Sequence, residues 1–278
     1  MRKAILLVLG AIVSVQFGSA IAKSLFPLAG PLALVWLRVT AAGLIMLAVV
    51  RPRPRRRTRA DWATLAWYSV SLITMNVTFY QAISHIPVGL TVTLEFLGPL
   101  GVAVYRSRGA RDLIWVGLAG AGVAVLGWSP GSLNWPGVIL ALVAGACWAS
   151  YILAAPHVGR HWPGAEPVAW ANLLGGVALV VPVLTLASTG LTNPWFWVGG
   201  LGLGLLSSVI PYGLELSALR TLDQRIFSIM MSIEPAMAAC TALLILGERL
   251  TATEVLAMAC IIAASAGITW TASHPKRP

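Results

Sequence analysis

Several polar and ionisable residues lie inside long apolar stretches of the sequence, where such residues are rare. A charge at the centre of a bilayer costs at least about 2.5–3.5 kcal/mol, so it normally faces a partner or a watery cavity and marks a functional path. Carboxylates in such a place can hold an ammonium group or a proton, and amide or hydroxyl groups can form hydrogen bonds with a solute. The candidates for binding a substrate or a proton are Arg38, Asn76, Tyr80, Glu95, Tyr212, Glu215 and Glu234.

The glutamate in the stretch LEFLGPL, Glu95, is the clearest case. Pro99 has no backbone N–H, so the carbonyl of Glu95 loses its helical donor, and the carboxylate and a free acceptor lie at one level of the helix. Gly98 allows another backbone to approach at this point. In the second half of the sequence, Pro235 similarly interrupts a helix next to Glu234. We therefore expect Pro99, Pro235 and Gly98 to give these helices the flexibility that gating needs.

Two further pairs of residues extend the candidate site. Pro211 interrupts an apolar stretch just before Tyr212 and Glu215. Asn76 and Tyr80 are four residues apart, so they share one face of a helix. We expect Asn76 and Tyr80 to orient a bound solute.

Each of these residues also has a structural explanation. Glu95 can be buried in its neutral form or can pair with Arg38, and that pairing would make Arg38 structural as well. Glu215 can lie near the membrane surface and pair with Arg220. The remaining candidates can serve helix packing or interfacial anchoring alone: Asn76, Tyr212 and Glu234.

The rest of the chain is strongly apolar. Of its 278 residues, 58% are hydrophobic and only 10% are charged, whereas a soluble domain usually carries about 25% charged residues. Apolar stretches of about 17 to 23 residues recur throughout, and each can cross a hydrocarbon layer of ~30 Å as a helix. The sequence therefore predicts an all-α membrane protein with ten transmembrane helices. The expected spans are residues 3–22, 31–50, 62–83, 88–105, 112–128, 136–155, 166–187, 194–217, 225–246 and 252–271.

The first of these stretches allows two interpretations. A basic start, an apolar core and the small residues SAIA before Lys23 are also typical of a cleavable signal peptide. However, Gln16, Gly18 and Ser19 form a stripe of polar and small residues that suits packing inside a helical bundle. We favour an uncleaved first span, which also gives an even number of spans.

The net charge of +10 does not indicate nucleic-acid binding, because the basic residues gather in loops between the spans. Sixteen of the 19 Lys and Arg residues fall on the side of the N-terminus, and only Lys23 and Arg249 fall on the other side. Basic loops face the cytoplasm, so we expect both termini to be cytoplasmic. The six arginines within residues 51–59 can also contact anionic lipid headgroups.

The two halves of the sequence resemble each other. AISHIP corresponds to ALRTLD 136 residues later, and the same offset places Gly98-Pro99 on Glu234-Pro235. Each half holds five expected spans, an odd number, so the halves must insert in opposite orientations. Inverted repeats are typical of secondary transporters, with the substrate site between the halves. We assign residues 1–130 to the first five-helix repeat, 135–272 to the second and 273–278 to a cytoplasmic tail.

Signatures of catalysis are absent from the sequence. It contains no HExxH, GxSxG or P-loop motif. Its four histidines lie at span ends or in loops without metal-ligand spacing, and its three cysteines form no CxxC pair. We expect no enzymatic activity, no cofactor and no metal site.

Several stretches resemble the EamA-domain transporters of the drug/metabolite transporter superfamily. They include FGSAIAKSLFP, FYQAISHIPVGLTVTLEFLGPL, PYGLELSAL and MSIEPAMAA followed by LGERLT. The pattern from EPAMAA to LGERLT is common to the broad family, whereas LEFLGPL with FGSAIAKSLFP is more similar to the bacterial threonine and homoserine exporters. The arginine-rich 51–59 loop departs from the family pattern.

The resemblance implies two inverted five-helix halves in the bacterial inner membrane, a central cavity and gradient-driven alternating access. It also implies that Glu95, Glu215 and Glu234 bind substrate or protons. We predict a transporter that exports a small amino acid such as threonine or homoserine. Membrane lipids are its other expected partners, and the sequence makes no prediction of the oligomeric state. The alternatives are a transporter of another solute, such as a cationic drug, a channel, or a non-transporting membrane protein.

Overall fold

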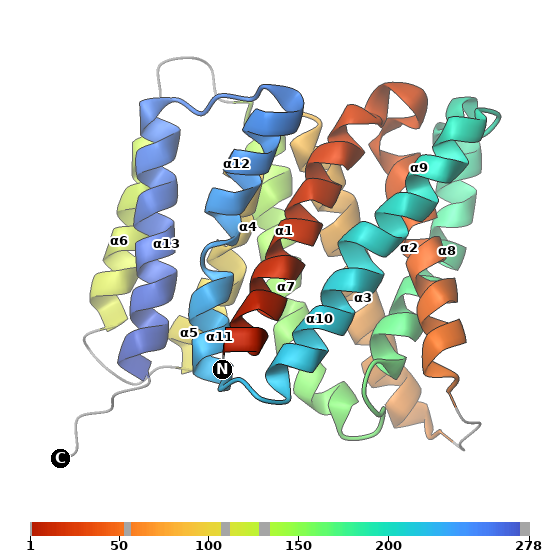
Figure 1. Ribbon diagram of the computed structural model, residues 1–278, viewed down its shortest axis with the longest axis horizontal. Helices are drawn as coiled ribbons and strands as arrows, with labels where there is room; N and C mark the ends of the chain where they lie inside the picture. Colours follow the sequence, from red (N-terminus) through yellow and green to blue (C-terminus); the bar gives the residue numbers. More distant parts are fainter. Residues whose placement is uncertain (1, 53–56, 107–111, 128–133, 273–278) are drawn as a thin grey trace.

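The computed structural model describes residues 2–52, 57–106, 112–127 and 134–272, and nearly all of them are helical (Figure 1). Part of the arginine-rich loop and the predicted tail, residues 273–278, lie outside the described residues. The elements are α1 (Arg2–Ser24), α2 (Phe26–Val50), α3 (Arg59–Ile83), α4 (Val88–Glu95), α5 (Leu97–Arg106), α6 (Asp112–Gly127), α7 (Trp135–Gly159), α8 (Glu166–Leu186), the 3₁₀ turn η1 (Ser188–Gly190), α9 (Pro194–Gly204), the π-helical turn η2 (Leu205–Val209), α10 (Ile210–Leu219), α11 (Gln224–Met231), α12 (Glu234–Leu246) and α13 (Ala252–Ala272).

Local sequence explains where several helices begin and end. The side chain of Thr58 accepts a hydrogen bond from the backbone N–H of Asp61, and the Asp61 carboxylate accepts one from the N–H of Thr58, so a capping box starts α3. The side chains of Asn134 and Asn193 cap α7 and α9 by accepting a hydrogen bond from the backbone N–H of Gly137 and of Trp195. Helix α12 ends at Gly247, whose φ of 69° is a left-handed conformation that glycine adopts without strain.

Within the described residues, eight helical segments are long and apolar enough to cross a membrane. Helix α6 contributes a shorter apolar segment, Leu113–Leu126, and α3 is a further helix of 25 residues outside this group. The structure therefore confirms a helical membrane fold. The expected total of ten spans in two repeats stays a prediction.

Three of the expected spans are interrupted, each next to a proline. The span at 88–105 consists of α4 and α5, and the span at 225–246 consists of α11 and α12. The span at 194–217 contains the π-helical turn η2 immediately before Pro211. A proline has no N–H and clashes with the preceding turn, which favours a departure from regular helix there. Each interruption lies within a few residues of a glutamate.

The helices pack in neighbouring pairs that join distant parts of the sequence. Helix α2 packs along α8 and α9, α1 along α10 and α12, α3 along α7 and α8, and α4 along α7 and α12. Helices α6 and α13 pack together at one end of the molecule, opposite α8 and α9 (Figure 1). The first turn of α1 and the last turn of α13 lie at the same edge, the lower one in Figure 1.

Candidate functional site

A cavity of about 250 Å³ lies among helices from both halves of the sequence. Its walls come from α1, α2, α3, α4, α7, α10, α11 and α12. Six of the seven candidate binding residues line it, namely Arg38, Asn76, Glu95, Tyr212, Glu215 and Glu234. Residues that are up to about 200 positions apart in the sequence therefore meet around one small space.

The interrupted helices place the three glutamates in the cavity wall. Glu95 is the last residue of α4, and Glu234 is the first residue of α12. Glu215 lies in α10, one turn after Pro211. The carboxylates are thus held next to the points where the backbone departs from regular helix, and Glu95 and Glu234 are only 8% and 6% exposed.

The three carboxylates form no hydrogen bond or ion pair with any other described residue. Glu95 therefore does not pair directly with Arg38, although the two lie close enough for their charges to attract each other. Glu215 likewise makes no ion pair with Arg220, which is exposed. Glu234 is close enough to both other glutamates for their charges to repel. The three carboxylates therefore remain available to accept hydrogen bonds from a solute in the cavity.

Arg38 and Tyr80 form a second part of the site. The guanidinium carbon of Arg38 lies 5.3 Å from the centre of the Tyr80 ring, and Arg38 Nε donates to Ser208 Oγ at 3.4 Å. Tyr80 itself does not line the cavity: it is fully buried beside Phe26, and its hydroxyl has no hydrogen-bond partner among the described residues. The geometry thus places Tyr80 beneath Arg38, where its ring supports the guanidinium.

Asn76 does reach the cavity, unlike its expected partner Tyr80. Its amide nitrogen donates to the carbonyl oxygen of Leu72 at 2.7 Å, one turn earlier in α3. This bond fixes the side chain and leaves the amide oxygen as an acceptor for a solute.

The expected hinge residues Pro99, Pro235 and Gly98 do not line the cavity. Gly98 instead packs against Gly145, where α5 crosses α7: a Cβ at Gly98 would overlap the Gly145 carbonyl oxygen. A Cβ at Gly145 would lie 2.8 Å from the carbonyl oxygen of Glu95. Gly98 in the stretch LEFLGPL predicted that another backbone would approach at this point. That backbone is α7, which packs directly behind Glu95.

Sequence reasoning did not identify several residues of the cavity wall. Gln16 and Ser19 of α1 line it, and their polarity within an apolar span was the available signal. Trp148 and Met231 also line it, but such residues are equally common in lipid-facing or packed positions. Their place in the wall follows only from the tertiary arrangement.

Among the described residues, no group of three or more His, Cys, Asp or Glu side chains is arranged to hold a metal ion. The three cysteines, Cys147, Cys240 and Cys260, are free thiols.

Comparison with known proteins gives a consistent result. The EamA-like transporter family matches residues 135–270. The threonine/homoserine exporter RhtA of Salmonella typhimurium (strain LT2) is 41% identical over 273 residues, which cover 96% of this chain and 91% of that protein. The threonine/homoserine exporter RhtA of Escherichia coli (strain K12) is 40% identical over 271 residues with the same coverage.

Two other proteins are more distantly similar to this chain, one over part of its sequence and one in its fold. Inner membrane protein YtfF of Escherichia coli (strain K12) is 28% identical over 53% of each chain. A crystal structure matches the whole of both chains with a TM-score of 0.67 and 17% identity, which indicates a shared fold alone.

Proposed function

The chain belongs to the EamA-like transporter family, and we propose that it is a secondary transporter that exports a small amino acid such as threonine or homoserine. Relatives named as threonine/homoserine exporters, 40–41% identical over nearly the full length, support this substrate class. The observation that carries the proposal is the cavity of about 250 Å³, into which three carboxylates and one guanidinium face.

The chemistry of the cavity suits a zwitterion. Glu95 and Glu234 offer carboxylates to an ammonium group, and Arg38 offers a guanidinium to a carboxylate. Asn76 offers an acceptor to a hydroxyl group such as that of threonine or homoserine. The volume lies below the range of about 300–1,000 Å³ that drug-sized ligands occupy, which favours a small solute.

The excess of carboxylates also provides a way to couple transport to a proton gradient. Three carboxylates around one small cavity repel one another when all are charged, and a bound ammonium group or proton relieves that repulsion. Glu95, at the interruption between α4 and α5, binds the ammonium group or relays a proton, while Glu215 and Glu234 hold the remaining charge. The amino acid and the proton then compete for the same carboxylates, which is the basis for exchanging one for the other across the membrane.

The packing of the helices supports two inverted five-helix repeats, residues 1–130 and 135–272. Under a two-fold repeat, each of the ten helical stretches corresponds to the stretch five places later in the chain. The contact between α2 and α9 then corresponds to the contact between α8 and α3, and the contact between α1 and α10 corresponds to the contact between α7 and α3. All four contacts are present. The same correspondence leaves the pairs α2·α8, α4·α12 and α6·α13 unchanged. Residues 1, 53–56, 107–111 and 128–130 of the first repeat, and the tail at 273–278, lie outside the described residues.

The distribution of charge supports an inner-membrane protein with both termini in the cytoplasm. The ends of α2, α5, α7 and α10 lie at the same lower edge of Figure 1 as the first turn of α1, and the basic loops of the sequence follow these ends. The opposite edge carries Lys23 and Arg249. We call the lower edge the basic edge and assign it to the cytoplasm.

Gating requires the halves to move around the cavity. The interruptions next to Pro99 and Pro235 split two cavity helices near Glu95 and Glu234, so the segments on either side can tilt separately. Gly98 holds α5 against α7 and thereby keeps one of these segments in place.

The proposal is tested by efflux from proteoliposomes that contain the purified protein and radiolabelled threonine. We expect saturable efflux that homoserine inhibits, that a pH gradient accelerates and that a proton uncoupler slows. Proteoliposomes with no protein provide the background. Transport of neither amino acid would refute the substrate assignment.

Export of another small solute, such as a cationic drug, is a second candidate. The observation in its favour is the set of aromatic side chains in the cavity wall, Trp148, Tyr151 and Tyr212, because aromatic rings bind cations. Efflux of a quaternary-ammonium dye in the same proteoliposomes, without efflux of threonine, would favour this alternative.

A further inference from the structure

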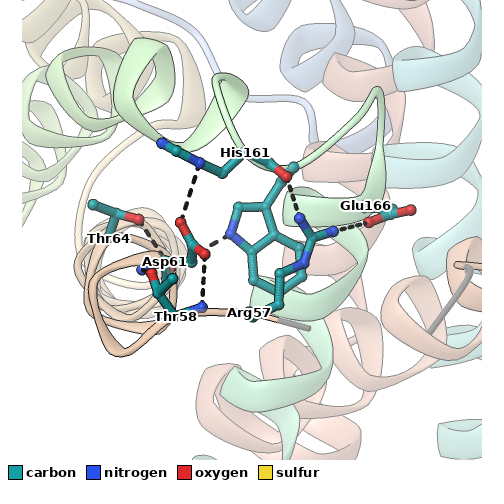
Figure 2. Close-up of polar contacts among 7 residues, drawn as sticks. Arg57, Thr58, Asp61, Thr64, His161 and Glu166 are labelled. Carbon is teal, nitrogen blue, oxygen red and sulfur yellow. Dashed lines mark hydrogen bonds and ion pairs between the residues drawn. The ribbon is translucent and has the colours of Figure 1, made fainter. Parts of the chain in front are cut away.

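A cluster of four ionisable residues and one tryptophan joins the two halves of the chain (Figure 2). The cluster lies at the basic edge, where α3 begins. We call it the latch and define it as Arg57, Asp61, His161, Trp162 and Glu166. Arg57 and Asp61 come from the start of α3 and the linker before it, and the other three residues come from the linker between α7 and α8 and the first residue of α8. About 100 residues of sequence separate the two sides of the latch.

Arg57 makes most of the contacts across the latch. Its Nη2 lies 3.0 Å from Oε2 of Glu166, and its Nη1 donates a hydrogen bond to the carbonyl oxygen of His161. The guanidinium carbon also lies 4.2 Å from the centre of the Trp162 ring. Figure 2 shows Arg57 between His161 and Glu166, where it ties both to the linker before α3.

Asp61 makes the second set of contacts. One oxygen of its carboxylate lies 3.3 Å from Nδ1 of His161, and the other accepts the backbone N–H of Thr58 at 2.8 Å. The Trp162 indole N–H donates to the carbonyl oxygen of Asp61 at 3.4 Å. The capping box that starts α3 is therefore also part of the contact between the halves.

Below the latch, packed side chains continue to the cavity. Trp162 is 3% exposed and belongs to one apolar cluster with Leu65, Val158 and Tyr68. The Tyr68 hydroxyl donates to the Tyr151 hydroxyl at 2.8 Å, with ring centres 4.5 Å apart. Tyr151 itself lines the cavity. The latch and this cluster thus fill the space between the cavity and the basic edge.

We propose that the latch is the gate of the cavity on the basic edge. Its ion pairs are formed while the cavity is closed to that edge, and they separate when the cavity opens to receive a solute from that side. The latch has this role only if the protein works by alternating access, as proposed above.

The position of the latch suits a contact that opens and closes repeatedly. It lies at the edge of the protein: the His161 side chain is 57% exposed, whereas the side chains of Arg57 and Glu166 are only 10% and 8% exposed and regain water when the two sides separate. Water regained by both charges offsets the loss of the Arg57–Glu166 ion pair when the two sides separate, whereas removal of one partner leaves the other charge buried and unpaired. The apolar cluster underneath supplies the barrier to water and solute, while the charged contacts set how often the two halves part.

The test measures access to a cysteine in the cavity wall. The reporter protein carries Met231→Cys, with Cys147, Cys240 and Cys260 replaced by serine. A membrane-impermeant cationic thiol reagent is added either to inverted vesicles, which expose the basic edge, or to spheroplasts, which expose the opposite edge. The test variant is Glu166→Gln, and the matched control is Arg59→Gln, because Arg59 is exposed at the same edge and makes no ion pair within the described residues.

We expect Glu166→Gln to increase labelling from the basic edge about tenfold and to slow labelling from the opposite edge, since loss of the contact shifts a two-state equilibrium toward one side. The charge-exchanged variant R57E/E166R restores the ion pair but not the hydrogen bond to the His161 carbonyl or the contact with the Trp162 ring, so it should recover only part of the original rate. Arg59→Gln should leave the rate unchanged. Unchanged labelling from the basic edge, in a variant that stays monodisperse in gel filtration, would overturn the proposal. An equal increase in labelling from both edges would also overturn the proposal, because it would show that the latch only holds the fold together. Labelling needs no amino acid, so this outcome is independent of the threonine efflux assay.

Discussion

Replacement of Gly98 by alanine should separate two helices directly behind Glu95. The added Cβ would overlap the Gly145 carbonyl oxygen and would lie 2.6 Å from its carbonyl carbon and 3.0 Å from its Cα. All three are backbone atoms, so no side-chain rotation relieves the clash, and α5 must move away from α7. Overpacking of this kind costs about 1–3 kcal/mol, and it opposes the gain of roughly 1 kcal/mol that alanine brings over glycine in a helix.

The matched control is Gly101→Ala in the same helix, one turn later. A Cβ at Gly101 meets nothing within 4 Å, so this variant should only gain helix stability. Thermal unfolding in detergent is expected to show Gly98→Ala below and Gly101→Ala at or above the wild type. Threonine efflux should fall in Gly98→Ala and persist in Gly101→Ala. Equal stability and equal efflux of the two variants would refute the proposed crossing of α5 and α7.

Three further substitutions test separate parts of the structure. Glu248→Gln should lower thermal stability by about 1–3 kcal/mol, because Glu248 pairs with Lys23 at 2.5 Å at the edge opposite the latch; a Tm equal to the wild type would show that this contact is not needed. Ser207→Ala should be neutral or stabilising in the same assay, since the buried Ser207 hydroxyl has no partner among the described residues, and a large loss would reveal a bond that the structure lacks. Asp61→Asn tests pH dependence: the hydrogen bond from the Thr58 backbone, with help from the charge of His161, holds the pKa of Asp61 below its ordinary value of 3.8. A lowered pKa stabilises the folded protein above pH 3.8, and this contribution disappears as the pH falls through the folded-state pKa. The stability difference between wild type and Asp61→Asn should therefore narrow as the pH falls below about 4, and a difference that widens in that range would contradict the assignment.

The membrane class and the helix interruptions could be predicted from the sequence because both depend on local chemistry. A long apolar stretch must form a helix in lipid, and Pro99, Pro211 and Pro235 remove backbone donors whatever surrounds them. The cost of burying a charge likewise makes Glu95 and Glu234 candidates from their sequence positions alone, and both line the cavity.

Contacts between distant segments could not be predicted in the same way. The four-residue spacing of Asn76 and Tyr80 defines a shared helix face, but only the packing of α2 shows that Tyr80 lies under Arg38 and outside the cavity wall. Gly98 signalled a close approach without identifying Gly145 as its partner.

The latch was equally hidden in the sequence. The charges of its residues lie in two linkers and in the first turns of α3 and α8, whose proximity depends on the whole fold. The arginine-rich segment before α3 suggested only a cytoplasmic loop and lipid contact. Its interactions depend on the start of α3 and the start of α8 lying side by side, which no local pattern in the sequence indicates.

The most direct test of the account compares export of preloaded threonine by the wild type and by Glu95→Gln at equal membrane abundance. Glutamine keeps the size of the side chain and one acceptor oxygen, but it replaces the other oxygen with an NH2 donor and removes the negative charge that faces the cavity. The account predicts that wild-type efflux responds to a proton uncoupler and that efflux by Glu95→Gln falls to background. Export by Glu95→Gln at the wild-type rate, with the same response to the uncoupler, would show that the Glu95 charge has no part in transport.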